Sequence, residues 1–226
     1  MALTLIIGNK NYSSWSFRPW IAMKTAGIAF TEQVISLDDP EFKSTLLGFS
    51  PAGKVPVLLD DDIHVWESLA ILDHVAERYP APNLWPQDSR TRTHARTIAC
   101  EMHAGFAPLR RHCPMNFWRP VQRRELPDPV VADVRRIDAM WAACIERYGG
   151  PFLFGRFTAA DAMYAPVVSR FHTYDVAVGA AARAYIGAVM ALPAWDEWQR
   201  AAIAEPWVLP HVEVDWPTVL KEPAAT

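Results

Sequence analysis

A proline-rich segment divides the chain into two parts with different patterns. Residues 80–88 read PAPNLWPQD, with three prolines in nine residues. A helix cannot continue through such a segment, because each proline lacks an amide donor and clashes with the preceding turn. Strand and helix patterns alternate before it, whereas the segments after it are helical in character. The sequence therefore predicts two domains, 1–80 and 88–226, with 81–87 as the linker.

The first part begins with a strand, a loop and a helix. Residues 3–7 (LTLII) form an apolar run typical of a buried strand, and the polar loop GNKNYSS leads into a helix that ends at Gly27. Residues 30–36 alternate as a strand should, and a short helix is expected over 40–48. These residues predict a β-α-β unit with a short second helix.

Two more strands and a helix complete the first part. KVPVLL and IHVW flank the turn residues DDD and are expected to pair antiparallel. The segment 67–79 has a helical period, with one face formed by Leu69, Leu72, Val75, Ala76 and Tyr79. The resulting order, βαβ(α)ββα, predicts a thioredoxin-like layer.

The second part is expected to be all helical. The predicted helices span 88–113, 128–148, 158–174, 180–191 and 193–203, and a tail rich in Pro and Trp follows. Thr158 and Asp161 have the spacing of a capping box, in which each satisfies an orphan N–H at the helix start. We expect this pair to support folding and not catalysis.

Composition and charge exclude several classes of protein. The net charge of -3 provides no general basic field, so neither nucleic acid nor an anionic membrane is an expected partner. Three cysteines without CxxC spacing fit a reducing compartment, and no apolar run has the length of a signal or membrane span, so we expect a cytoplasmic protein. No metal-binding pattern appears among the seven histidines: His64, His74, His94, His103, His112, His172 and His211.

Four motifs in order along the chain carry a resemblance to a known family. They are NYSSWSFRPW, GKVPVL, WESLAI and FGRFTAADAMYAP. Together they resemble the cytosolic glutathione S-transferases. The resemblance implies a thioredoxin-like domain that binds glutathione and an all-helical domain that shapes the pocket for a second substrate. It also implies a homodimer and an enzyme without a metal.

In the serine and cysteine classes of this family, the reactive residue lies five positions before an arginine. That spacing selects Ser13 and Arg18. A helix N-terminus lowers the pKa of a thiol placed against it, and a serine hydroxyl there can donate to the glutathione thiolate. Ser13 could instead be only the helix cap. A shift of the loop would bring one of three alternatives to the thiol: Tyr12, Ser14 or Ser16.

The resemblance also implies how glutathione is held. The Val55–Pro56 bond is expected to be cis, with the Val55 backbone pairing with the cysteinyl part of glutathione, although an ordinary trans edge proline is the alternative. Lys54 could meet the glycyl carboxylate, as could Lys43. Ser68 at a helix start could receive the γ-glutamyl carboxylate and Glu67 its ammonium group. Helix capping alone is the competing interpretation of these two residues.

The identity of the second substrate stays open at this level. Arginines 92, 96, 110 and 111 could attract an anionic electrophile or could simply be solvated, and Trp15, Trp20, Trp118 and Trp207 could form an apolar wall or belong to the core. We predict attack of a glutathione thiolate on a small electrophile. SSWS resembles the SSCS of the zeta class, which implies an isomerase or dehalogenase of zeta type as an alternative, but Trp15 replaces the cysteine. A non-catalytic interaction module of the same fold is the other alternative.

Overall fold

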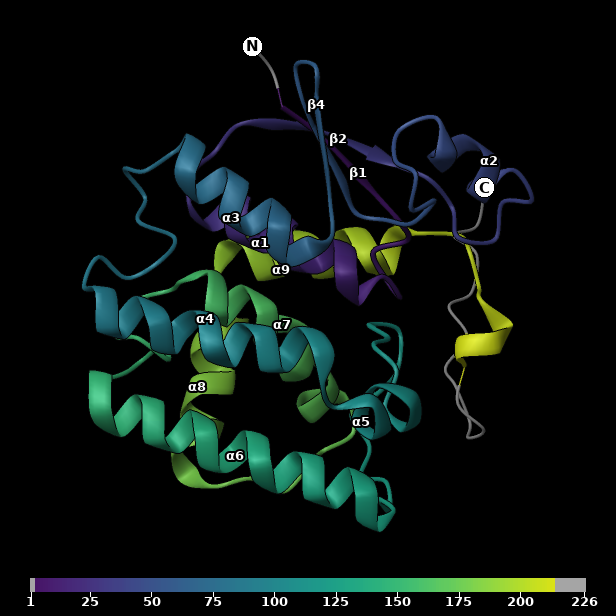
Figure 1. Ribbon diagram of the computed structural model, residues 1–226. Helices are drawn as coiled ribbons and strands as arrows, with labels where there is room; N and C mark the ends of the chain where they lie inside the picture. Colours follow the sequence, from purple (N-terminus) through teal and green to yellow (C-terminus); the bar gives the residue numbers. More distant parts are fainter. Residues whose placement is uncertain (1–2, 214–226) are drawn as a thin grey trace.

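The computed structural model describes residues 3–213 and confirms the predicted order of elements in the first part (Figure 1). Its elements are β1 (Leu3–Ile7), α1 (Ser14–Thr25), β2 (Phe30–Val34), α2 (Phe42–Leu47), β3 (Val57–Asp60), β4 (Ile63–Trp66) and α3 (Ser68–Arg78). β3 begins after Pro56, so the proline precedes the strand and removes no donor from its ladder.

The four strands form one mixed sheet in the order β2-β1-β3-β4. β1 and β2 are parallel, whereas β3 runs antiparallel to both β1 and β4, as predicted for the pair joined by the DDD turn. α1 and α3 lie together on the side of the sheet that faces the helical part (Figure 1). α2 belongs to a separate small core, whose buried members are Ile6, Ile35, Leu46 and Val57.

The second part is helical, as predicted. Its elements are α4 (Ser89–Ala104), α5 (Ala107–His112), α6 (Asp128–Tyr148), α7 (Ala159–Thr173), α8 (Ala180–Met190), α9 (Pro193–Ala204) and the 3-10 turn η1 (Pro210–Val212). The side chain of His211 lies outside the described part of the chain.

One predicted helix is wrong: the segment 88–113 forms two helices and not one. The chain breaks at Gly105 and at Phe106, whose φ of 59° lies in the left-handed region. A Cβ at position 105 would lie 2.7 Å from the Glu101 carbonyl oxygen, so only glycine fits there. Pro108 then occupies the first turn of α5. The break turns α5 away from α4.

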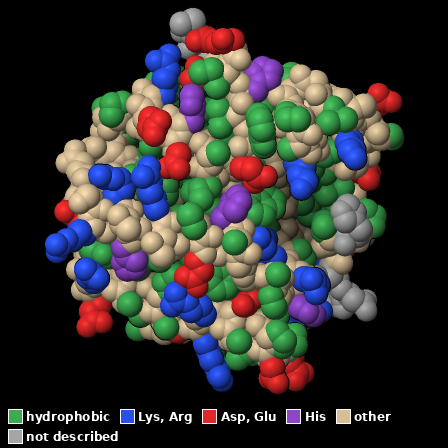
Figure 2. Space-filling model, viewed as in Figure 1, with side chains coloured by type: hydrophobic (Ala, Val, Ile, Leu, Met, Phe, Trp, Pro, Cys, Tyr) green, Lys and Arg blue, Asp and Glu red, His purple; other side chains and the backbone are tan. Residues whose placement is uncertain are grey.

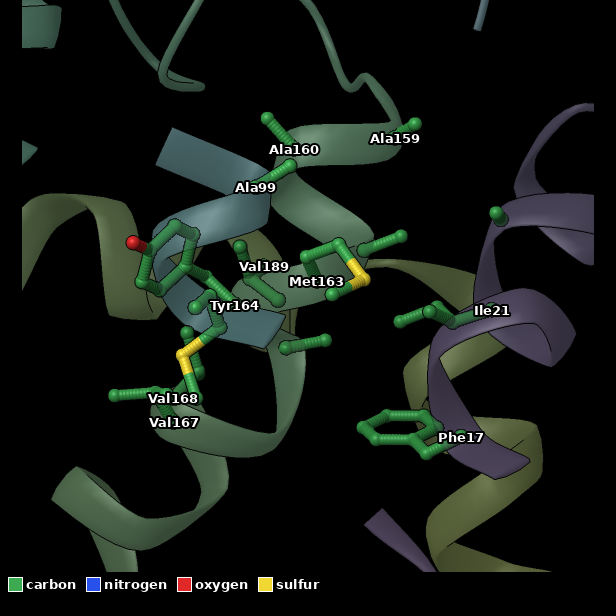
Figure 3. Close-up of a cluster of buried hydrophobic side chains, with 14 of the residues drawn as sticks. Phe17, Ile21, Ala99, Ala159, Ala160, Met163, Tyr164, Val167, Val168 and Val189 are labelled. Carbon is green, nitrogen blue, oxygen red and sulfur yellow. The ribbon is translucent and has the colours of Figure 1, made fainter. Parts of the chain in front are cut away.

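α1 and α7 join the two parts through one continuous apolar core. Phe17 and Ile21 on α1 face the α7 side, where Met163 projects toward them (Figure 3). Nearly every residue of α7 is buried, including a tyrosine, Tyr164, whose hydroxyl donates to the Ile98 carbonyl at 3.0 Å. Because α7 contacts both α1 and α4, its position fixes how the helical part lies against the sheet.

The start of α7 has the predicted capping box. The backbone N–H and the hydroxyl of Thr158 each donate to Asp161 Oδ2 at 2.7 Å, and the Leu153 N–H donates to Oδ1 at 3.0 Å. Asp161 is fully buried, and this burial raises the pKa of its carboxyl group to about 6. Its three donors are contributed by the backbone and side chain of the helix entry, which gives this residue a structural role.

On the face shown in Figure 2, acidic and basic side chains of the described residues are intermixed, and no large patch carries charge of a single sign. No helix among the described residues is both long and apolar enough to cross a membrane. Within residues 3–213, no group of three or more His, Cys, Asp or Glu side chains is arranged to hold a metal ion. The three cysteines are free.

Candidate functional site

Two adjoining pockets lie where the sheet meets the helical part. The first pocket, of about 140 Å³, is lined by Trp15, Ala52, Lys54, Val55, Pro56, Trp66, Glu67 and Ser68. The second pocket, of about 390 Å³, is larger and is lined by residues from both parts of the chain. Trp15, Lys54 and Val55 line both pockets, so a molecule in one can touch a molecule in the other.

The first pocket brings together four of the five residues considered for glutathione binding, Lys54, Val55, Glu67 and Ser68. The fifth, Lys43, is exposed and does not line the pocket. The Val55–Pro56 bond is cis, as the resemblance implies. Val55 lies just outside the paired registers of β3, and its backbone is therefore placed to pair with an extended ligand.

Glu67 and Ser68 form the floor of the first pocket at the start of α3. Glu67 adopts a φ of 69° and a ψ of 124°, an unusual conformation for a residue with a side chain, and such strain gathers at functional sites. Its carboxylate makes no capping hydrogen bond. Ser68 is fully buried, and within residues 3–213 its hydroxyl has only the Met163 sulfur, at 3.9 Å, as an acceptor. Side-chain capping of α3, the competing interpretation, is thus absent.

Ser13 is the N-cap of α1 and also lines the second pocket. Its Oγ accepts the Ser16 N–H at 3.4 Å and donates to Ser16 Oγ at 2.7 Å. Ser16 Oγ in turn accepts the Gly8 N–H at 3.1 Å. Capping and a place in the pocket are therefore compatible, and Ser13 lies within a short chain of hydroxyls.

The three alternatives to Ser13 occupy different positions. Ser16 is fully buried beneath Ser13. Tyr12 lines the second pocket, but its hydroxyl donates to Glu213 Oε1 at 2.8 Å, and burial raises the pKa of this phenol. Ser14 is half-buried at the first position of α1, and its hydroxyl has no hydrogen-bond partner among residues 3–213. Ser13 and Ser14 are thus the hydroxyls best placed toward the second pocket.

The loop that carries Ser13 is held by carboxylates from the end of the chain. Glu205 accepts the N–H groups of Lys10 and Asn11 at 2.6 and 3.0 Å, across 195 and 194 positions of sequence. Glu213, beside η1, accepts the Tyr12 hydroxyl, and it also pairs with the Asn116 amide and the Arg119 guanidinium. The position of this loop therefore depends on both parts of the chain.

Of the four tryptophans considered for an aromatic wall, only Trp15 lines these two pockets. Trp20 is buried in the core. Trp118 packs edge-on against Tyr12 and donates to the Ala202 carbonyl at 2.9 Å, and Trp207 lies at a separate surface hollow. Of these four, Trp15 alone contributes to the aromatic lining, which also includes Trp66 in the first pocket and Tyr12 and Phe42 in the second.

Sequence reasoning missed two residues that the structure places at the site. His103 on α4 packs edge-on against Trp15 and lies 3.7 Å from the Glu67 carboxylate. Burial lowers the pKa of its imidazole, while the nearby Glu67 carboxylate acts in the opposite direction. Arg170 on α7 lines the second pocket. A single arginine within an apolar helical run, APVVSRF, is the signal that could have found it.

The four arginines considered as partners of an anionic electrophile lie in different environments. Arg92 donates to the carbonyls of Pro86 and Gln87, Arg96 pairs with Asp73 at 3.1 Å, and Arg111 is exposed. Only Arg110 of these four lines the second pocket.

Family models of both domains match this chain. The model described as "Glutathione S-transferase, N-terminal domain" matches residues 12–78, and "Glutathione S-transferase, C-terminal domain" matches residues 99–201. The chain belongs to the glutathione S-transferase family. This confirms the predicted family and, at that level, the predicted function. Both pockets are lined mainly by residues within these two matched regions.

Individual relatives of this glutathione S-transferase carry several names. A probable maleylacetoacetate isomerase of Caenorhabditis elegans is 36% identical over 97 residues, which cover 43% of this chain and 45% of that relative. The maleylacetoacetate isomerase of Rattus norvegicus is 28% identical over 169 residues, covering 73% of this chain and 76% of the rat protein. Among solved structures, a glutathione transferase homolog from Burkholderia with bound glutathione is similar to this chain, with a TM-score of 0.69 and 22% sequence identity. The superposition covers 89% of this chain and 98% of the Burkholderia chain. This likeness confirms the thioredoxin-like and helical fold.

Proposed function

We propose that this protein is a glutathione transferase, which holds glutathione as a thiolate for attack on a small electrophile. The observation that carries the proposal is the first pocket, where the Val55 backbone, the start of α3 and the Glu67–Ser68 pair face one cavity beside Ser13. In this proposal residues 1–80 bind glutathione, residues 81–87 link the domains, and residues 88–226 shape the second-substrate pocket.

Each part of glutathione has a proposed partner in the first pocket. The Ser68 N–H and hydroxyl receive the γ-glutamyl carboxylate, which the positive end of α3 favours. The exposed Glu67 carboxylate takes the ammonium group. The Val55 backbone pairs with the cysteinyl unit as an added strand would, and Lys54 meets the glycyl carboxylate. The ligand therefore lies with its sulfur toward the start of α1.

Ser13 is the proposed hydroxyl that stabilises the thiolate. The glutathione thiol gives its proton to solvent, and the sulfur anion accepts a hydrogen bond from Ser13 Oγ at the positive end of α1. Because hydroxyl hydrogens rotate, Ser16 can donate to Ser13 in this state, while Gly8 N–H still donates to Ser16. The sulfur then attacks the electrophile in the second pocket.

Two further properties are proposed from family membership. We propose a homodimer, the arrangement that the resemblance implies, and a cytoplasmic location, which the free cysteines favour.

Calorimetric titration of glutathione in buffers of different ionisation enthalpy tests the proposal. The wild type should bind glutathione and release a proton. Ser13→Ala should still bind but release less, and Ser14→Ala should behave as the wild type. Proton release lost only in Ser14→Ala would assign the role to Ser14, and absence of binding in all three proteins would favour the interaction module.

A second candidate is glutathione-dependent isomerisation or dehalogenation of the zeta type. The names of the worm and rat relatives favour it, whereas Trp15 in place of the cysteine of SSCS argues against it. An isomerase regenerates glutathione and a transferase consumes it, so the glutathione concentration after complete conversion of maleylacetoacetate distinguishes the two.

A further inference from the structure

Two arginine side chains lie over the ring of Trp15, which lines both pockets, and a third arginine lines the second pocket. The Arg18 guanidinium lies 4.0 Å from the centre of the indole ring, and that of Arg110 lies 4.9 Å from it. Arg170 faces the same region from α7 and, with Arg110, lines the second pocket. Arg18 and Arg170 are 1% and 4% exposed, so these positive charges are almost completely removed from water.

No carboxylate of the described residues forms an ion pair with any of these three arginines. Arg170 donates to the carbonyls of Cys113 and Pro166, and Arg110 to those of Met102 and His103. Nε and Nη1 of Arg18 and Nε of Arg110 are buried without an acceptor in residues 3–213. Neutral carbonyls satisfy some donors but do not balance the charge.

Such an arrangement of buried positive charges is unfavourable by itself. Burial lowers the pKa of all three guanidinium groups, and the positive charge of Arg110 lowers those of Arg18 and Arg170 further. A buried charge normally has a counter-charge, because removing it from water is costly. Asp133 and Glu67 offset this in part, for Arg110 and Arg18 respectively, but neither is close enough to form an ion pair. A further negative charge is therefore favourable here, and the second pocket is where it can enter.

We propose that the second pocket binds electrophiles that carry a carboxylate, and that Arg110 and Arg170 receive this group. This rests on the proposed function, since the electrophile must lie beside the glutathione sulfur at Ser13. The other walls, which include Phe42, Pro114 and Met115, suit an apolar body on the same molecule. Arg18 acts behind Trp15 as a positive charge that does not touch the ligand.

Thioethers of glutathione test the proposal without requiring turnover. S-methylglutathione occupies the first pocket alone and reports glutathione binding. S-(carboxymethyl), S-(2-carboxyethyl) and S-(3-carboxypropyl) glutathione place a carboxylate at increasing distances from the sulfur. Each has a matched carboxamide of nearly the same shape, and Kd is measured by calorimetry for every pair in the wild-type protein.

At least one carboxylate should bind about tenfold more tightly than its carboxamide, because a hydrogen-bonded charge pair in a desolvated site is worth this much. Equal affinities within all three pairs, with S-methylglutathione binding normally, would overturn the proposal and leave the proposed function standing. Failure of S-methylglutathione itself to bind would overturn the proposed function, and the proposal with it.

Variants assign the preference to residues. Arg110→Gln should reduce the carboxylate preference to within about twofold while S-methylglutathione binds as before. Arg111→Gln, at the exposed neighbour on α5, should keep the full preference. Arg170→Lys keeps a buried charge but loses the planar fork, and should reduce the preference by less than Arg110→Gln does. A preference that survives in Arg110→Gln and Arg170→Lys alike would overturn the assignment.

Discussion

The two pockets differ in how they are built. The first pocket is built around a cis proline and the start of a helix, and all of its lining residues except Trp15 lie within residues 52–68. The second pocket uses side chains from the Ser13 loop, α2, α5, α7 and the C-terminal segment. Backbone positions follow directly from the fold, whereas a pocket of side chains changes with every substitution. The same fold can thus keep one ligand and vary the other.

The largest effect is expected from a substitution at the start of α7, the helix that contributes to both pockets. Asp161→Ala leaves the buried donors of Thr158 and Leu153 without their acceptor, and should lower the free energy of unfolding by roughly 3 kcal/mol. Because α7 supplies Met163 beneath the first pocket and Arg170 to the second, binding in both should weaken together. Urea unfolding and titration of S-methylglutathione measure this. Asp138→Ala is the control, since Asp138 accepts a more exposed N–H, that of Gly179, and should cost less than about 1 kcal/mol.

Glu213→Ala should weaken ligand binding in the second pocket without changing ligand binding in the first. The variant frees the Tyr12 hydroxyl and removes the carboxylate that pairs with the buried Arg119, so the unfolding free energy should fall by about 2 kcal/mol. Calorimetry should show unchanged binding of S-methylglutathione but weaker binding of bulkier thioethers. Glu197→Ala breaks an exposed pair with Lys24 and should change neither quantity measurably. Equal losses for all ligands in Glu213→Ala would mean that the two pockets are not independent.

Ser68→Ala should have the opposite effect: it should weaken binding in the first pocket and leave the ligand preference of the second pocket unchanged. Loss of the hydroxyl proposed to bind the γ-glutamyl carboxylate should weaken glutathione binding by only about tenfold, or about 1.4 kcal/mol, because the α3 N–H groups remain. The ratio of affinities between matched carboxylate and carboxamide thioethers should stay as in the wild type. Ser44→Ala, at an exposed serine of α2, is the control and should leave both values unchanged. A changed ratio would contradict the division between the pockets.

The smallest expected effect concerns backbone strain at Glu67. Glu67→Gly should raise the free energy of unfolding by up to about 1 kcal/mol, since glycine adopts a positive φ without a steric cost, while glutathione binds less tightly. Asp61→Gly relieves another positive φ away from both pockets, and should leave glutathione affinity unchanged. Chemical denaturation and calorimetry on the two variants separate strain from binding. Tighter glutathione binding in Glu67→Gly would contradict the role given to this side chain.

The first pocket could be predicted from sequence because its parts are local. GKVPVL and WESLAI each contain both the fold signal and the ligand-facing residues, so recognising the motif places the residue. The capping box of α7 has the same property, because Thr158 and Asp161 lie three positions apart. In motifs of this kind, the local backbone structure determines the relative positions of the residues.

The second pocket could not be predicted because its geometry depends on distant contacts. Arg110 and Arg111 are adjacent in sequence, yet one lines the pocket and the other faces solvent. Which of them turns inward depends on the break at Gly105 and Phe106, where a continuous helix was predicted. Arg170 meets Arg110 only because α7 packs between α1 and α4, and no local pattern encodes that approach.

Glu205 and Glu213 accept hydrogen bonds from the loop before α1, so this loop cannot reach its final structure until both glutamates have been synthesised. On the ribosome, the chain emerges from its first residue, and domains fold as they become complete. The strands and α3 are available early, but the two carboxylates that contact residues 10–12 are made about 200 residues after that loop. A nascent chain can therefore assemble most of the first pocket before the loop that carries Ser13 is in place. The loop before α1 gains these contacts only after residues 205–213 have been made.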